Sequence, residues 1–178
     1  MIDPDSVTRP AQRLQAVMTT GAAVLILAMM GLAVAMMTNL GGLGMTLADM
    51  AGFGSGPLKT WQSLGLSAVV AAHIAVWIIL FALVGRVFGH LADGDADAAA
   101  RQARRLSYWL WGMLIWGIVS QMIVSVVATW GFGDGQRELT IGLGTAQISI
   151  ALSALIAGFM ARAFALGAEL WRDHREMV

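Results

Sequence analysis

Four long apolar stretches dominate the pattern of hydrophobic and polar positions, and most polar residues fall between them. The stretches cover residues 18–37, 64–84, 108–129 and 143–166, and none alternates with the period of a strand. A helix needs about 20 residues, at about 1.5 Å each, to cross a hydrocarbon core about 30 Å thick. Because lipid admits only helices and closed barrels, the pattern predicts an all-α integral membrane protein. We expect a single four-transmembrane-helix bundle over residues 1–178.

The connections between these stretches carry their own signals. In the long, glycine-rich segment 38–63, "LGMTLADMAGF" has enough apolar residues for a short helix along the membrane surface, with glycines and Pro57 to end it. In "LADGDADAAARQARRL", residues 91–106, Asp95 or Asp97 precedes an alanine-rich run. An aspartate there can cap the free N–H groups of a helix. The third helix is therefore predicted to begin well before its apolar stretch.

Composition agrees with a membrane protein. Hydrophobic residues make up 58% of the chain and charged residues 12%, with a mean hydropathy of +0.72. The absence of cysteine excludes disulfides and thiolate metal sites. Little of the chain lies outside the four stretches, which leaves no room for a separate catalytic domain.

Basic residues predict how the chain is threaded. Only Lys59 and Arg137 lie in the first and third connections. The others lie before the first stretch, in the middle connection or at the end of the chain: Arg9, Arg13, Arg86, Arg101, Arg104, Arg105, Arg162, Arg172 and Arg175. By the positive-inside rule both termini and the middle connection are cytoplasmic. Arg101, Arg104 and Arg105 then form a cytoplasmic basic cluster.

His73 is the one histidine inside an apolar stretch. Counted along the helices, it lies about 14 Å from the outer boundary, and Gln121 lies about 20 Å from the inner one. Both are therefore near the bilayer centre, where polar groups pair across helices. We expect a neutral His73 to share a hydrogen bond with Gln121, directly or through one water. On the third helix Gln121 belongs to a small, polar stripe formed by Gly117, Gln121, Ser125 and Thr129.

Haem ligation, quinone contact and proton transfer are the alternatives for His73. A bis-histidine haem site needs a second histidine, but His90 and His174 fall in cytoplasmic segments, so only a dimer could supply the pair. We therefore expect no cofactor and no metal site. No nucleophile, base and charge stabiliser converge in the pattern, so we expect no catalytic residues and no enzyme activity.

The fourth stretch carries small residues at steps of four: Ser149, Ser153, Ala157, Ala161 and Ala165. Small residues let helix backbones approach closely in membranes. The pattern predicts a helix-packing seam, either inside the bundle or on a surface for another membrane protein, and we favour the internal seam.

Two segments, "LVGRVFGHLADGDADAAARQARRLSYWLWGML" and "ALIAGFMARAFALGAELWRDHREMV", resemble the bacterial membrane-protein family known as domain of unknown function 2975. The first set of matching positions is Gly94, Arg104, Arg105 and Leu106, and the second is Gly167, Leu170 and Glu176 or Asp173. The chain departs from the family at Asp95 and Ala96, where the family usually has a Pro-Phe or Ile-Phe pair.

The resemblance implies four spans in a bacterial inner membrane and, because similar proteins are often encoded beside small helix-turn-helix regulators, a cytosolic regulator as partner. It supplies no catalytic residue. We therefore expect a non-enzymatic, multi-pass inner-membrane protein that acts through protein contacts, as a sensor, a regulator partner or an accessory subunit of a larger complex. Its expected partners are the lipid bilayer and another protein or a second copy of the chain, with no direct nucleic-acid binding. The alternative is a haem- or quinone-binding electron-transfer subunit that uses His73.

Overall fold

A computed structural model describes residues 5–53, 57–131 and 139–176 of the protein. Within these residues the chain forms α1 (Asp5–Met50), α2 (Thr60–Ala92), α3 (Ala96–Thr129) and α4 (Thr145–Glu176), with no strand. Each helix contains a stretch long and apolar enough to cross a membrane. The prediction of an all-α fold with four helices long and apolar enough to span a membrane is confirmed.

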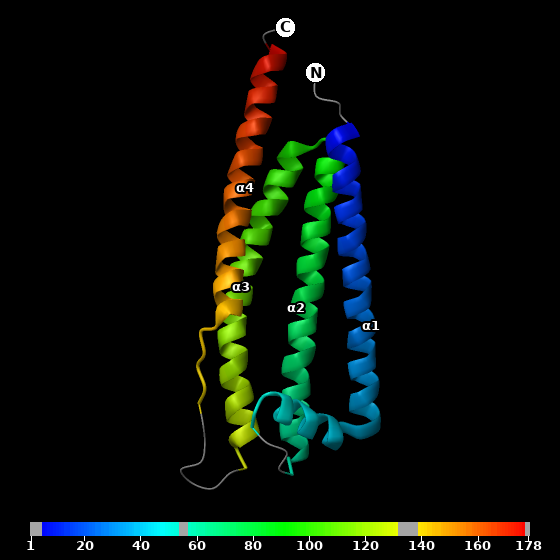
Figure 1. The fold of residues 1–178 in the computed structure, drawn as a ribbon, viewed down its shortest axis with the longest axis vertical. Coiled ribbons are helices and arrows are strands. Elements are labelled where there is room, and N and C mark those ends of the chain that lie inside the picture. The colour runs from blue at the N-terminus through cyan, green and yellow to red at the C-terminus, as the bar shows by residue number, and fades with distance from the viewer. Residues whose placement is uncertain (1–4, 54–56, 132–138, 177–178) are drawn as a thin grey trace.

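The helices form a row in chain order, with α1 and α4 at its edges (Figure 1). Extensive packing joins α1 to α2, α2 to α3 and α3 to α4, and among the described residues α1 and α4 are not packed together in this way. The predicted bundle is therefore open between its first and last helices. The start of α1, the α2–α3 turn and the end of α4 lie at one end of the molecule, which we call the terminal end (Figure 1). We call the opposite end the far end.

Small residues bring α1 and α2 close together. A Cβ added at Gly21 would lie 2.5 Å from the ring of Phe81, and one at Gly85 would lie 3.5 Å from Met18 Cβ. The two pairs keep the same antiparallel register. At each of these two positions, the missing side chain of glycine leaves room for a large side chain of the other helix. Such pairs are common where helices pack in membranes.

The α2–α3 turn is set by Gly94 and Asp95. Gly94 has a φ of +73°, a conformation that glycine adopts without steric cost. The N–H of Asp95 donates to the carbonyl of His90 and that of Gly94 to the carbonyl of Leu91, the bond pattern of a Schellman motif. Asp95 Oδ1 then accepts the N–H of Ala98 at 2.8 Å. Of the two candidate caps, Asp95 is the one used, and α3 begins before its apolar stretch as predicted.

Near the far end α1 bends sharply at Asn39, whose φ of −153° and ψ of 65° are not helical. Asn39 Oδ1 accepts the N–H of Gly42 at 3.0 Å, so it caps the helix that follows. Residues 40–50, which we call the crossing segment, turn across the row at the far end (Figure 1). This segment contains most of the predicted short helix. It packs tightly on α2, because a Cβ at Gly44 would lie 2.8 Å from the Cα of Ser63.

Burial differs from that of a water-soluble bundle. The largest of the fully buried side chains are polar, namely Gln62, Thr129, Ser63, Ser67 and Ser125, whereas large apolar side chains such as Leu27, Met30 and Phe159 are exposed. A water-soluble fold places its apolar side chains inside. Large apolar side chains on the outer surface suit helices surrounded by hydrocarbon.

Candidate functional site

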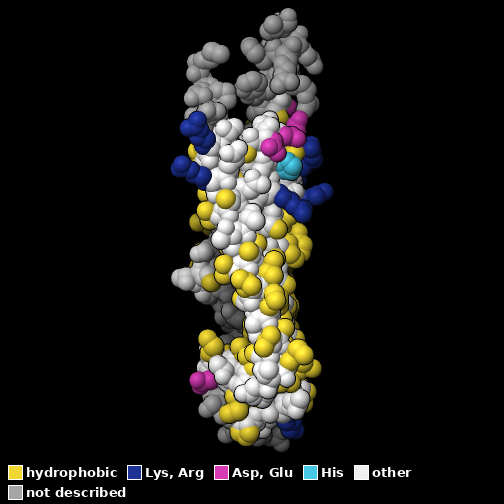
Figure 2. Space-filling model, turned by 90° about the vertical axis from the view of Figure 1, so that its right-hand side faces the viewer, with side chains coloured by type: hydrophobic (Ala, Val, Ile, Leu, Met, Phe, Trp, Pro, Cys, Tyr) yellow, Lys and Arg dark blue, Asp and Glu magenta, His cyan; other side chains and the backbone are white. Residues whose placement is uncertain are grey.

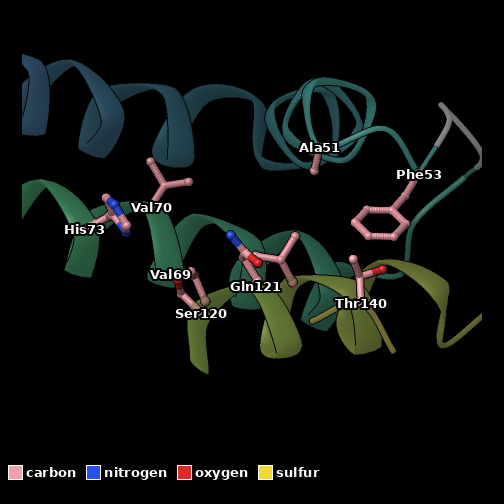
Figure 3. A pocket seen from close by; sticks show the side chains of 9 residues that line it. Ala51, Phe53, Val69, Val70, His73, Ser120, Gln121 and Thr140 are labelled. Carbon is pink, nitrogen blue, oxygen red and sulfur yellow. The ribbon is translucent and has the colours of Figure 1, made fainter. Parts of the chain in front are cut away.

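His73 and Gln121, both predicted to lie near the bilayer centre, line one cavity. It has a volume of about 500 Å³ and lies between α2, α3 and the residues Ala51 and Phe53, which follow the crossing segment. His73 lines one end, Phe53 and Thr140 line the other, and Ser120 and Gln121 lie between them (Figure 3). The remaining lining residues are aliphatic, and none of the described ones is charged. The sequence placed His73 and Gln121 at similar depth, and the structure puts them on the same cavity.

Gln121 is held by the chain that leads into α4. Its Oε1 accepts the backbone N–H of Gly142 at 3.1 Å. This bond fixes the orientation of the amide group, since an N–H donor can only face the oxygen. The NH₂ group of Gln121 makes no hydrogen bond within the described residues. It is therefore a free donor at the cavity.

The polar stripe of α3 provides hydrogen-bond acceptors for the irregular segment 139–144. This segment lies extended beside α3 (Figure 1). Besides the Gln121–Gly142 bond, Ser125 Oγ accepts the N–H of Thr140 at 3.2 Å. A step of four helical residues covers about 6 Å, and two extended residues cover about 6.6 Å. The stripe therefore matches alternate N–H groups of an extended chain running antiparallel to α3.

The same geometry explains why α4 begins late. Gln121 lies just over two turns before the end of α3, so the chain runs about 12 Å back along α3 without forming a helix. Leu143, which was predicted to start the fourth span, lies in this segment and is exposed, and α4 begins at Thr145. The N–H of Gly144 donates to Gln147 Oε1 at 2.9 Å, which supports the first turn of α4.

His73 is half-buried, and its imidazole makes no hydrogen bond within the described residues. No direct hydrogen bond joins His73 to Gln121 among the described residues, and the carbonyl oxygen of Gln121 instead accepts the N–H of Gly142. Depth matching predicted a shared location but could not reveal this competing donor. A water-mediated link across the cavity stays a prediction.

The sequence did not single out Ser120 and Thr140 as cavity residues. Ser120 Oγ donates to the carbonyl of Gly117 within α3, which leaves its oxygen able to accept a further bond. Thr140 comes to the cavity on the irregular segment. The alternating glycines of "TIGLGT" before α4 were the one sequence signal for an extended stretch there.

The predicted seam of α4 is only partly the packed face. Ala157 and Ala161 are buried, Ala165 is half-buried, and Ser149 and Ser153 are exposed. Steps of four drift by about 40° each around a helix, so five such positions cannot share one face. The seam instead includes Ala154, whose carbonyl accepts Ser107 Oγ of α3 at 2.9 Å.

The hydroxyl groups of the two exposed seam serines donate hydrogen bonds within α4. Ser149 Oγ donates to the carbonyl of Thr145 and Ser153 Oγ to that of Ser149. Ser153 lies on the edge of a second hollow, an apolar groove of about 400 Å³ to which all four helices contribute. Met18 lines it from α1, Phe81 from α2, Leu110 from α3 and Met160 from α4.

Arginines gather toward the terminal end. Arg101, Arg104 and Arg105 are exposed on the first turns of α3, and Arg9, Arg13 and Arg86 are exposed nearby. Figure 2 shows the basic side chains in this region, with hydrophobic side chains covering the middle of the molecule. No group of three or more histidine, aspartate and glutamate side chains suited to a metal occurs in the described part of the chain.

Comparison with known proteins adds no relative: no family model, no curated protein and no solved structure matches the chain. The resemblance to the domain of unknown function 2975 family therefore stays a prediction.

Proposed function

We propose that this chain is a non-enzymatic, multi-pass protein of a bacterial inner membrane that acts through contacts with another membrane protein, as an accessory or regulatory subunit. The observation that carries the proposal is the open row of helices. The helices α1 and α4 each have one extensively packed neighbour, and between them runs the apolar groove to which all four helices contribute.

A transmembrane helix of a partner suits this groove. In hydrocarbon, helices associate through close packing where small residues face them. Ser153 and Ala157 provide such positions on the α4 side, and the hydroxyl of Ser153 is already bonded within its own helix. A partner helix would thus meet no unsatisfied polar group at Ser153.

The basic residues support a topology with both termini in the cytoplasm. Arginines concentrate near the terminal end, whereas Lys59 lies at the start of α2 near the far end. The positive-inside rule then places the terminal end in the cytoplasm. The exposed cluster Arg101, Arg104 and Arg105 would face a cytosolic regulator of the kind that the family resemblance implies.

The test is purification from native membranes in a mild detergent, with mass spectrometry of the chains that co-purify. Ser153→Phe fills the groove, and Ser149→Phe is its matched control, because it lies one turn away on the same helix, is exposed and does not line the groove. We expect a discrete partner with the wild type and with Ser149→Phe, and its loss with Ser153→Phe. A chain that co-purifies with lipid alone would contradict the proposal.

A further inference from the structure

We propose that the cavity between His73 and Gln121 is a binding site for a neutral, amphipathic molecule whose carbonyl oxygens accept hydrogen bonds, such as the headgroup of an isoprenoid quinone or the ester region of a diacyl lipid. The inference is independent of the partner proposed above, because the cavity and the groove have no lining residue in common.

The first argument is the hydrogen-bonding capacity left at the cavity wall. Gly142 fixes Gln121 with its NH₂ group as the free end, and that group has two N–H donors. The imidazole of His73 offers an N–H donor, and it has no partner among the described residues. Polar groups at this depth are costly when they stay unpaired. Carbonyl oxygens of a bound molecule would accept hydrogen bonds from the donors that these two side chains leave unused.

The second argument is the absence of charge. None of the described lining residues is an acid, a lysine or an arginine. Among these described residues a phosphate would find no cation, and a cation would find no carboxylate. Haem is also a poor fit, because His73 is the one histidine among the described residues that line the cavity. The occupant is therefore neutral.

The third argument is size and shape. A volume of about 500 Å³ is within the usual range for small-molecule sites, which is about 300–1,000 Å³. Val69, Val70, Val124 and Phe53 supply apolar walls around the polar groups. Such walls suit a flat ring or an acyl chain beside its carbonyl. Apolar walls with a few placed donors are the general character of ligand sites.

Histidine NMR tests the site directly. The chain has three histidines, so the imidazole resonances of selectively labelled protein in lipid nanodiscs are few, and His73→Leu assigns one of them. His90 lies in the last turn of α2 and is an internal control. We expect a decyl-substituted benzoquinone to shift the His73 resonance saturably and to leave that of His90 unchanged.

A second arm separates the two sources of carbonyl groups. Nanodiscs of diester lipid are compared with nanodiscs of diether lipid, which lacks the ester carbonyl. A His73 shift between the two lipids, without added quinone, identifies lipid as the occupant. A shift that needs the quinone identifies the quinone.

Gln121→Glu is the matched variant for both arms, because a carboxyl oxygen can still accept the N–H of Gly142 while the NH₂ donors are gone. We expect it to weaken the response of His73 by about tenfold in apparent affinity, in line with the loss of a hydrogen bond. If neither the quinone nor the change of lipid moves the His73 resonance, the proposal is overturned. An equal response in Gln121→Glu would also overturn it.

Discussion

The backbone N–H of Gly142 donates a hydrogen bond of 3.1 Å to the side-chain Oε1 of Gln121, although 21 residues separate the two in the chain. This bond ties the irregular segment before α4 to the last third of α3. Backbone groups outside helices need partners in hydrocarbon, where no water can replace them. Gln121 therefore has two roles: its carbonyl supports the entry to α4, and its amino group faces the cavity.

Gln121→Leu should release the segment 139–144. The N–H of Gly142 would lose its acceptor, and an unsatisfied buried donor costs about 1–3 kcal/mol. We expect faster hydrogen exchange at Gly142 and Gly144 and a lower free energy of unfolding. Exchange resolved by NMR or mass spectrometry measures the first effect, and unfolding in detergent micelles measures the second.

Gln121→Glu is the control, because it keeps an acceptor oxygen near Gly142. Its exchange at Gly142 should stay close to that of the wild type. Should Leu and Glu release the segment equally, the bond to Gly142 would not be what holds it.

Gly44→Ala should be strongly destabilising, because the new Cβ would lie 2.8 Å from the Cα of Ser63, which is backbone and cannot move aside easily. The crossing segment would be pushed away from α2. Gly41→Ala is a close control, since its Cβ meets nothing within 4 Å and alanine favours a helix by about 1 kcal/mol. Thermal unfolding should show a large loss of stability for Gly44→Ala and none for Gly41→Ala. Equal effects of the two changes would rule out close packing at Gly44 as the cause.

The spanning helices could be predicted because each depends on local composition. An apolar stretch of sufficient length forms a helix in hydrocarbon whatever its neighbours are, so each predicted span overlaps a helix. The cap at Asp95 and the helix within residues 40–50 were predictable for the same reason. Their signals lie within a few residues.

The partners of the polar residues could not be predicted in this way. Depth counted along the chain placed His73 and Gln121 at one level. The carbonyl oxygen of Gln121, however, accepts a backbone N–H, and no periodic pattern in the sequence indicates such a partner. The predicted start of the fourth span at Leu143 was two residues too early, because "LGT" is apolar enough to belong to a span, whereas its glycine disfavours a helix. The openness of the row depends on packing between distant helices, which spacing within one helix does not reveal.

The proposed threading predicts which surface positions are accessible from outside the cell. The chain has no cysteine, so single cysteines can be introduced without removing any native one. Asp49, in the crossing segment, and Asp93, in the α2–α3 turn, are both exposed and lie at opposite ends. Asp49→Cys should react with an impermeant maleimide in intact cells, and Asp93→Cys only after lysis. The reverse pattern would place the termini outside.

Gln62 links the start of α2 to the end of α3 and is almost fully buried, with 1% of its surface exposed. Its Oε1 accepts the N–H of Lys59 at 2.8 Å, and its Nε2 donates to the carbonyl of Val127 at 2.8 Å. Gln62→Leu keeps the approximate volume but breaks both bonds, and we expect a loss of about 1–3 kcal/mol because buried polar groups stay unpaired.

Gln62→Glu separates the two bonds, because it can still accept from Lys59 but no longer offers the amide donor to Val127. Both variants should separate Trp61 from Trp130, whose rings now meet edge to face with centroids 6.1 Å apart. Tryptophan fluorescence, with Trp61→Phe to assign the signal, reports that separation. A Gln62→Glu protein with the stability and fluorescence of the wild type would show that the bond to Val127 does not hold α2 against α3.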